Sequence, residues 1–557
     1  MDLRADGWPP VTEPGPEVTG TSRSGIPWAD TTRSDVPPSG DPRPGTPPSG
    51  TGPAADGRRP LRVLLVSEGA YPFHPGGVSL WCDQIVRGMP EHTFTVVALT
   101  VDGTEPVVWP APANLTEVVG VPLWGDPPRR SRRARRTPPP DAFTEAHEHI
   151  LRTLARPPEP GPAAARRAAE SSVPALRALH DHARTGDLRA ALTGDEALDR
   201  MTRVWREAGD REAAGAGPLG LHDAYTAADL MEHTLRPLSH PPVDADVCHL
   251  AMNGPSALVG LAAKWAHGTP LVMSEHGVYL RERYQDALGD DVPPGALMML
   301  RFHRALAEAA YHCADVLAPH SRHNRRWQLH GGADPDRIRT MYNGIDPADY
   351  PVATGEPDVP TVVYVGRVDP MKDLHTLIRA FALVRDEVPD ARLRMFGPVA
   401  ADQRAYHASC LALIDELGLT GTAVFEGRVP RQVDAYGAGH LTALTSVSEG
   451  FPYTVVESMS TARPQVCTQV GGVPEAVGDA GILVPPGDHR AVAGACVRLL
   501  RDAGLRRRLG DAARARVLER FTLAQWTDGY RALYDTLVPH QPPPGRRAAG
   551  RERVTAP

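Results

Sequence analysis

Short apolar runs alternate with helical patterns along most of this chain. The run LRVLLVSEG (61–69) is rich in leucine and valine and ends in glycine, as expected of a buried strand. A Gly-Gly turn in YPFHPGGVSLWCDQIVRGM then opens a helical pattern, and FTVVALT (94–100) predicts the next strand. This β-loop-α-β order predicts a parallel sheet with right-handed crossovers.

The alternation resumes after about residue 240 and continues in two series. In the first, DVCHLAM, PLVMSEHG and DVLAPHS predict strands, separated by the helical pattern PSALVGLAAKWAH and a long helix near 295–314. The Pro- and Asp-rich connector DPADYPVATGEPDVP follows. The second series predicts strands at 361–365, RLRMF, AVFEG, LTALTS, PQVCTQV and GILVPP.

The first helix of the second series carries an apolar stripe. Its apolar residues lie at i, i+3, i+4 and i+7, as in a helix that covers a sheet: Leu374, Leu377, Ile378 and Phe381. Two Rossmann-like α/β domains therefore account for most of the chain. Ligands of such sheets bind at the carboxyl ends of the strands, so we expect the site in a cleft between the domains.

The same patterns predict the boundaries of the parts. We expect a leader at 1–58, a first domain at 59–345 with an insertion at about 125–240, a second domain at 346–520, a helix at 521–538 that packs back towards the first domain, and a tail at 539–557. The leader and tail are too rich in small and polar residues to form a core, so we expect disorder there. The insertion holds the basic run RRSRRARRTPPP and a weakly amphipathic alanine-arginine stretch, so we expect partial mobility.

Charge and cysteine content exclude several classes of protein. The net charge of -7 supplies no general positive field, so we expect no nucleic-acid partner. The six cysteines are widely spaced without a CxxC pair, which argues against a disulfide framework and a structural zinc site. The sequence has no signal-peptide pattern and no run near the ~20 apolar residues of a membrane span. We expect a cytoplasmic protein, and we leave open peripheral association with the membrane or with a polysaccharide-export complex.

Two cations follow the first strand of the second series, in YVGRVDPMKDLHTL. Arg367 comes just after the strand, and Lys372 lies at or near the start of the next helix. Cations beside a helix start are typical of a diphosphate site. The alternative is a pair of solvated surface charges. That alternative is weakened because only two of the 60 basic residues are lysine, Lys264 and Lys372.

A second loop contains two glutamates, in SVSEGFPYTVVESM. The pattern predicts a turn at Gly450 and a helix that starts around Pro452 to Thr454, so Glu449 precedes the helix and Glu457 lies in its first turns. Such a pair is usually an exposed helix face. However, a helix start that binds an anion, with a carboxylate on each side for hydroxyl groups, suits a nucleotide sugar.

These motifs carry a resemblance to a known family. GRVDPMKDL and SEGFPYTVVESMSTARPQVCTQVGGVPEAV resemble the retaining glycosyltransferases of family four, which have the GT-B fold. The resemblance implies that Arg367 and Lys372 bind the donor diphosphate, Glu449 contacts the transferred sugar, and Glu457 binds the ribose hydroxyls. The resemblance also implies that the loop between the two glutamates binds the donor, through Gly450, Phe451, Pro452, Tyr453 and Thr454. The sequence departs from the family at Pro452, where many members have glycine.

The first domain carries further parts of the resemblance. In EGAYPFHPGGVSLW, Gly76 and Gly77 resemble the family's glycine loop, which approaches the diphosphate and the acceptor. In MSEHGVYLRERY, we expect Glu275 and His276 to point towards the cleft, and the resemblance implies that His276 contacts the transferred sugar. It also implies contacts to the base from the loop after AVFEG, through Arg428 and Val429.

EGAYPFHPGGVS, SEHGVYLRER and GFPYTVVE resemble a narrower subgroup, the pellicle or exopolysaccharide glycosyltransferases with a long insertion in the first domain. This resemblance implies transfer of a hexose from UDP-glucose, with retention, to a saccharide or lipid-linked acceptor, without a metal or other cofactor. Two alternatives stay open. One is a non-catalytic subunit that binds a nucleotide or glycan in an export complex, and the other is a GT-B phosphorylase, epimerase or trehalose-type synthase.

Overall fold

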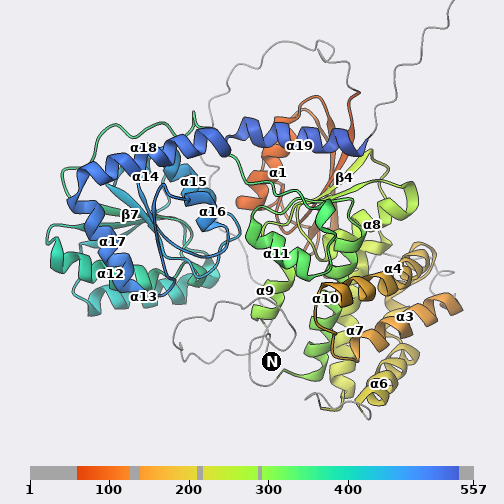
Figure 1. Cartoon of the computed structure of the whole chain (residues 1–557). Coiled ribbons are helices and arrows are strands. Elements are labelled where there is room, and N and C mark those ends of the chain that lie inside the picture. Colours follow the sequence, from red (N-terminus) through yellow and green to blue (C-terminus); the bar gives the residue numbers. More distant parts are fainter. Residues whose placement is uncertain (1–58, 126–137, 210–216, 287–291, 539–557) are drawn as a thin grey trace, which may run out of the picture.

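The computed structural model describes residues 59–125, 138–209, 217–286 and 292–538. The predicted leader (1–58), the predicted tail (539–557) and most of the run RRSRRARRTPPP lie outside these residues. The described part contains two parallel six-stranded sheets, each covered by helices, and they lie side by side in Figure 1. The predicted fold class of two Rossmann-like domains is confirmed.

The first sheet has the strand order β3-β2-β1-β4-β5-β6, with every pair parallel. Its strands are β1 (Arg62–Glu68), β2 (Thr93–Thr100), β3 (Leu115–Pro122), β4 (Val247–Leu250), β5 (Leu271–Met273) and β6 (Val316–Leu317). Both faces of β1 are buried, as its continuous apolar run predicts. The sequence analysis missed β3, because this edge strand buries only Val121 and its apolar signal is weak.

The helices that accompany this sheet include the three that were expected, from the glycine turn, from PSALVGLAAKWAH and near 295–314. They are α1 (Gly77–Gly88), α8 (Pro255–His267), α9 (Tyr279–Asp286), α10 (Pro294–Cys313) and α11 (Arg322–His330). The Gly-Gly turn thus opens α1 as predicted, at Gly77.

The insertion between β3 and β4 is a packed group of helices. They are α3 (Asp141–Leu154), α4 (Pro162–Thr185), α5 (Leu188–Thr193), α6 (Asp195–Gly209), α7 (Leu221–Leu235) and the short η1 (Arg236–Ser239). Their apolar residues, among them Phe143, Leu179 and Met201, belong to the same core cluster as Leu64 and Val66 of β1. The described helices of the insertion are therefore an extension of the first domain's core, which its weak amphipathic pattern did not predict.

The second sheet has the order β12-β11-β10-β7-β8-β9 and is also parallel throughout. Its strands are β7 (Thr361–Val365), β8 (Arg392–Phe396), β9 (Ala423–Gly427), β10 (Leu441–Leu444), β11 (Gln465–Thr468) and β12 (Ile482–Val484). Its helices include η3 (Pro370–Lys372), α12 (Leu374–Glu387), α13 (Arg404–Glu416), α14 (Gln432–Gly437), α15 (Tyr453–Ser460), α16 (Val473–Val477) and α17 (His489–Arg501). The predicted stripe of α12 is fully buried.

The last two helices, α18 (Ala503–Arg520) and α19 (Leu523–Leu537), run from the second domain to the first along one side of the molecule (Figure 1). In α19, Trp526, Tyr530 and Tyr534 pack in the core of the first sheet. The chain crosses between the domains twice, once at Ile345 and once between α18 and α19, and the two segments are in contact at Ile345. Its N–H donates to the Phe521 carbonyl (2.9 Å), and its carbonyl accepts from the N–H of Leu523 (2.7 Å).

Candidate active site

The loop after β7 places Lys372 directly before α12. Asp369 caps the short η3 by accepting from the N–H of Met371 (2.8 Å), and Asp373 caps α12 by accepting from the N–H of Thr376 (3.2 Å). Asp373 has a φ of 44°, a left-handed conformation that turns the chain between the two helices. This sharp turn between two capped helices fixes Lys372 beside the loop that follows β10.

Lys372 and Glu449 form an ion pair, with 2.5 Å between Nζ and Oε1. The Ser446 hydroxyl also donates to this carboxylate oxygen (2.6 Å). The hydroxyl of Thr445 donates to the carbonyls of Lys372 and Asp373, both at 3.0 Å. The loops after β7 and β10 are thus joined around a pair whose side chains are 19% and 10% exposed.

Arg367 lies in the same loop but outside this pair. Its side chain is 72% exposed and contacts Asp369 at 3.6 Å. The Arg367 carbonyl accepts from the Tyr364 hydroxyl (2.7 Å), which fixes the backbone while the guanidinium extends into solvent. The loop after β7 therefore carries two cations in different surroundings: Lys372 is largely buried in its ion pair, and Arg367 is solvated.

The start of α15 lies against the first domain. Pro452 is its N-cap residue, so the helix begins at Tyr453, within the predicted range. The Tyr453 hydroxyl donates to the side-chain oxygen of Gln84 on α1 (3.2 Å), and a Cβ at Gly77 would lie 3.9 Å from the Tyr453 ring. A Cβ at Gly450 would lie only 2.2 Å from the His276 carbonyl oxygen. The glycine loop, the end of β5 and the start of α15 thus meet.

Phe451 and Pro452 are buried rather than open to a ligand. The Phe451 ring packs against Tyr342 and Phe521, with centroid distances of 5.2 and 5.4 Å. Thr454 follows in the first turn of α15 and is half-buried. Phe451 therefore acts as an anchor for the loop, which leaves Gly450 and the helix start as the parts nearest the first domain.

Glu457 lies in the second turn of α15 with 2% of its surface exposed. The Tyr436 hydroxyl donates to its Oε2 (2.6 Å). Burial raises the pKa of the Glu457 carboxyl, and hydrogen bonds from Tyr436 and Tyr350 oppose that rise. Tyr436 thus occupies one oxygen of this carboxylate. The sequence analysis missed Tyr436, and no signal in DAYGAG marks it.

His276 follows β5 in a group of aromatic rings. Its ring lies 4.0 Å from that of His320 and 5.0 Å from that of Trp81, centroid to centroid. Burial, together with His320 and His249, holds the pKa of His276 well below its usual value, so the ring is neutral. Among the described residues, its Nε2 has no hydrogen-bond partner and is buried.

Glu275 points into the first domain, so the expectation that it faces the other domain is wrong. It is fully buried and accepts hydrogen bonds from Tyr311 on α10 (2.8 Å), Gln328 on α11 (3.2 Å) and the Tyr279 N–H (3.1 Å). Burial raises the pKa of Glu275 to about 7. The residue holds together the elements around His276.

The loop after β9 places the two expected base contacts beside the Glu457 end of the site. Arg428 is exposed, and Val429 packs against the cluster that contains Tyr436. This places both residues at the carboxyl edge of the second sheet.

Two further contacts across the domain boundary were not expected from the sequence. Arg281 on α9 donates to the hydroxyl of Ser448, next to Glu449. Glu475 of α16 accepts from the N–H groups of Arg322 (2.8 Å) and His323 (3.1 Å), so a carboxylate of the second domain caps α11 of the first. Glu475 was visible in the GGVPEAV motif, but its capping role needs tertiary structure.

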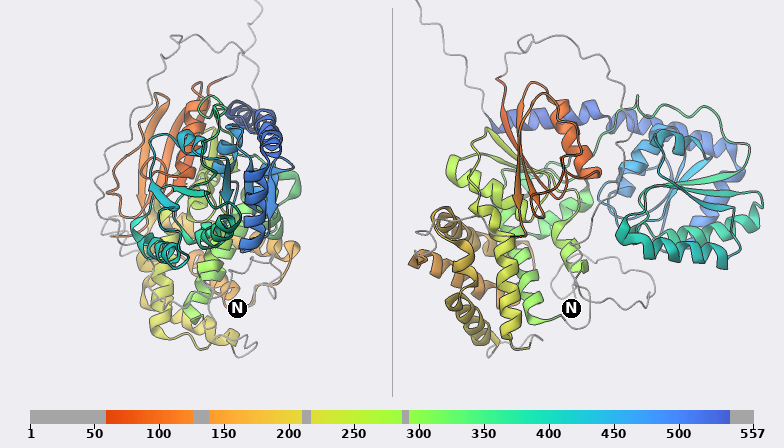
Figure 2. Two further views of the ribbon diagram at one scale, coloured as in Figure 1. Left: turned by 90° about the vertical axis from the view of Figure 1, so that its left-hand side faces the viewer. Right: turned by 180° about the vertical axis from the view of Figure 1, so that it is seen from behind.

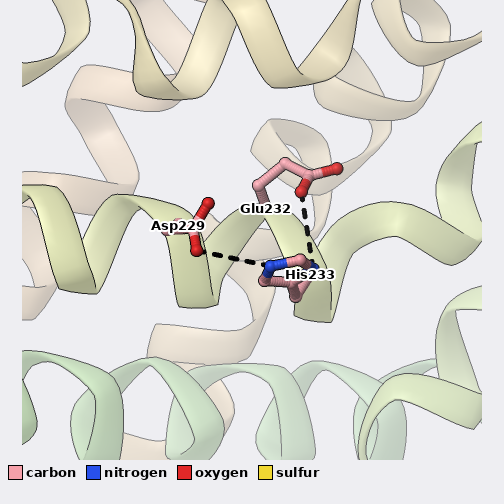
Figure 3. A group of neighbouring side chains, drawn as sticks. All are labelled: Asp229, Glu232 and His233. Atoms are coloured by element: carbon pink, nitrogen blue, oxygen red, sulfur yellow. Dashed lines mark ion pairs between the residues drawn. The ribbon is translucent and has the colours of Figure 1, made fainter. Parts of the chain in front are cut away.

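One group of described side chains has metal-binding geometry, and it lies in the insertion on α7: Asp229, Glu232 and His233 (Figure 3). Arg189 approaches both acids (3.2 and 3.4 Å), and Arg236 pairs with Glu232 at 2.7 Å. These arginines already balance the acids, so the group is best described as an ion-pair network. In the described residues, we find no helix long and apolar enough to cross a membrane.

Comparisons with known proteins agree with this geometry. The family described as "Domain of unknown function (DUF3492)" matches residues 61–336, and "Glycosyl transferases group 1" matches residues 359–502. Among solved structures, sucrose-phosphate synthase from Thermosynechococcus elongatus is 18% identical with a TM-score of 0.55, covering 86% of this chain and 98% of that one. HepE of Anabaena, solved with UDP and glucose, is 14% identical with a TM-score of 0.53, covering 86% and 100%. Both show the GT-B fold.

Two curated relatives extend the comparison to activity. D-inositol 3-phosphate glycosyltransferase of Acidothermus cellulolyticus is 31% identical over 348 residues, which are 59% of this chain and 75% of the relative. N-acetyl-alpha-D-glucosaminyl L-malate synthase of Bacillus anthracis is 26% identical over 306 residues, 52% of this chain and 74% of the relative. The chain therefore belongs to the group 1 glycosyltransferases of family four, retaining enzymes with the GT-B fold that transfer a sugar from a nucleotide sugar.

Proposed function

We propose that this enzyme transfers glucose from UDP-glucose, with retention, to a hydroxyl of a saccharide or lipid-linked acceptor in exopolysaccharide synthesis. The resemblance of EGAYPFHPGGVS, SEHGVYLRER and GFPYTVVE to the exopolysaccharide subgroup supports the donor and the pathway class. The likeness in fold to HepE, which was solved with UDP and glucose, is compatible with this donor.

The observation that carries the proposal is the Lys372–Glu449 pair beside the start of α15. In the proposed complex, the diphosphate lies between Lys372, Arg367 and the N–H groups of that helix start. These groups stabilise the negative charge that develops as the bond from the sugar to the diphosphate breaks. We assign to these two cations the charge compensation that a metal supplies elsewhere, so no cofactor is required.

The sugar end lies where Glu449, Gly450 and His276 meet. Glu449 accepts from sugar hydroxyls once Lys372 turns towards phosphate, and the unpartnered Nε2 of His276 contacts the sugar. The acceptor oxygen attacks the anomeric carbon on the face that the diphosphate leaves, and the acceptor proton passes to the departing phosphate oxygen. His276 is a poor base for this proton because its pKa is depressed.

The test measures UDP release from UDP-glucose with saccharide acceptors, with phosphate or with water alone, together with thermal shifts by UDP-, GDP- and ADP-sugars. We expect acceptor-dependent release that EDTA does not inhibit, and stabilisation by UDP-glucose of about 2.7 kcal/mol at a hundredfold excess over Kd. Glu449→Ala should abolish release, whereas Glu426→Ala, which changes an exposed glutamate of β9, should not. Phosphate-dependent release would identify a phosphorylase, and a shift by GDP- or ADP-glucose alone would refute the proposed donor.

A further inference from the structure

A cavity of about 420 Å³ lies in the insertion, between the end of α3, the loop that follows it, the start of α4 and α10. Its volume is within the roughly 300 to 1,000 Å³ that is common for small-molecule sites. These helices form the lower right part of the molecule in Figure 1, and the right-hand view of Figure 2 shows them below the first sheet and away from the second domain. The cavity is therefore separate from the site built on Lys372 and Glu449.

The cavity is cationic although the protein is acidic. Five arginines line it, at positions 152, 156, 167, 301 and 304, against two glutamates, Glu159 and Glu308. Arg304 and Glu308 form a buried pair at 2.7 Å, and Arg167 pairs with Glu159 at 2.9 Å. These pairs leave an excess of three positive charges among the lining residues.

The surroundings add to this positive character. Arg152 pairs with Glu148 at 2.5 Å, but Arg203 contacts the same carboxylate at 3.0 Å, so one acid serves two cations. The first turn of α4 also lines the cavity through Ala164 and Ala165, and this 24-residue helix has no side-chain cap at its start. The positive end of the helix dipole at this start favours an anion.

The remaining lining residues suit a sugar better than a bare ion. Thr153 and Ser171 offer hydroxyl groups, and Pro157, Pro158 and Ala168 offer small apolar surface. A sugar ring presents both hydroxyl groups and C–H faces, so it can use both kinds of surface together with the arginines. A phosphate ion would use the charge and the hydroxyl groups but not the apolar surface.

We propose that this cavity binds an anionic saccharide, a sugar unit that carries a carboxylate or a phosphate group. Arg152, Arg156 and Arg167 hold the anionic group, for which Arg167 leaves its exposed pair with Glu159, and the hydroxyl and apolar residues hold the ring. Binding here does not depend on the donor or acceptor proposed above.

The experiment measures calorimetric binding of trigalacturonate, glucose 6-phosphate, neutral maltotriose and inorganic phosphate to the full chain. We expect binding of at least one anionic saccharide, at least tenfold weaker in Arg156→Ala/Arg167→Ala and weakened by salt. Arg177→Ala is the matched control, because Arg177 is an exposed arginine of α4 that does not line the cavity. Tighter binding of trigalacturonate would identify the ligand of the cavity as a carboxylated glycan, and tighter binding of glucose 6-phosphate would identify it as a sugar phosphate.

Saturating UDP and the Lys372→Ala variant should leave this binding unchanged, which separates it from the donor site. The proposal is overturned if neither anionic saccharide binds, if maltotriose or inorganic phosphate binds as tightly, or if Arg177→Ala weakens binding as much as the double variant does.

Discussion

The two sheets share the strand order 3-2-1-4-5-6, counted from each domain's first strand, but the ends of their strands carry different chemistry. The second sheet presents partly exposed charges, Arg367 and the Lys372–Glu449 pair. The first presents His276, a half-buried neutral ring after β5, while Glu275 beside it turns into the core of the first domain. The same topology thus supports a charged edge on one sheet and a neutral edge on the other.

This difference follows the needs of the reaction. A departing diphosphate needs fixed positive charge, and in the proposed mechanism Lys372 and Arg367 at the loops of the second sheet supply it. The transferred sugar and the acceptor hydroxyl are neutral and react better where water is excluded. Substitutions at the strand ends of one sheet, or at the contact between the two sheets, therefore test this comparison.

The largest effect is expected from removal of the charge at Lys372. Lys372→Ala should lower kcat by about 10² to 10³, or about 3 to 4 kcal/mol, because the charge on the leaving diphosphate loses a partner. Lys264→Ala is the matched control, since this other lysine pairs with Asp315 on the far side of β5 from the loops of the second domain. Steady-state kinetics of both variants provide the measurement. Equal activity of the two variants would contradict the assigned role.

Glu275→Gln tests the neutral edge through stability. Burial raises the pKa of Glu275 from about 4.5 in the unfolded chain to about 7, so the folded state keeps this proton to a higher pH. The contribution of Glu275 to the free energy of unfolding is therefore fully present below about pH 4.5. It is lost as the pH rises through 7, by up to about 3 kcal/mol. In thermal unfolding, the stability of the glutamine variant relative to wild type should increase from pH 5 to pH 8. A pH-independent difference would show that Glu275 titrates normally.

Gly450→Ala tests the contact between the edges. The new Cβ would lie 2.2 Å from the His276 carbonyl oxygen, so the domains must separate. We expect kcat/KM for the donor to fall about tenfold, or about 1.4 kcal/mol, with a larger radius of gyration in solution scattering. Gly494→Ala in α17 is the control, because its Cβ would meet no atom within 4 Å. Wild-type kinetics in Gly450→Ala would mean that this approach is dispensable.

The smallest effect concerns the hydrogen bond from Tyr453 to Gln84. A double-mutant cycle of Gln84→Ala and Tyr453→Phe should give a coupling of about 0.5 to 1.5 kcal/mol in kcat/KM, as for a neutral hydrogen bond. Additive effects of the two substitutions would show that the bond contributes nothing to the active form.

The sequence was sufficient where a local pattern determines structure. Continuous apolar runs predicted eleven of the twelve strands, and the spacing of Leu374, Leu377, Ile378 and Phe381 predicted the buried face of α12. Lys372 and Glu449 were each placed in a loop that leaves a strand of the second series, and the carboxyl ends of parallel strands lie at one edge of the sheet.

The rest depends on tertiary packing. The strand β5 is short and buried on both faces, so alternation could not show that Glu275 turns inward while His276 does not. Tyr436 reaches Glu457 from a helix that is distant in sequence. The cationic cavity also combines residues from α3, α4 and α10, and a weakly amphipathic pattern carries no sign of such a grouping.

The double link at Ile345 has a mechanical consequence. Because the outgoing and returning segments are hydrogen-bonded to each other there, we expect them to act as a single hinge between the domains. The contact between Gly450 and His276 lies close to this link, because Phe451 packs against Tyr342 and Phe521. A chain cut after residue 520 would keep the loops after β7, β9 and β10. It would lose the returning segment of the link at Ile345 and the aromatic residues of α19 that cover the first sheet.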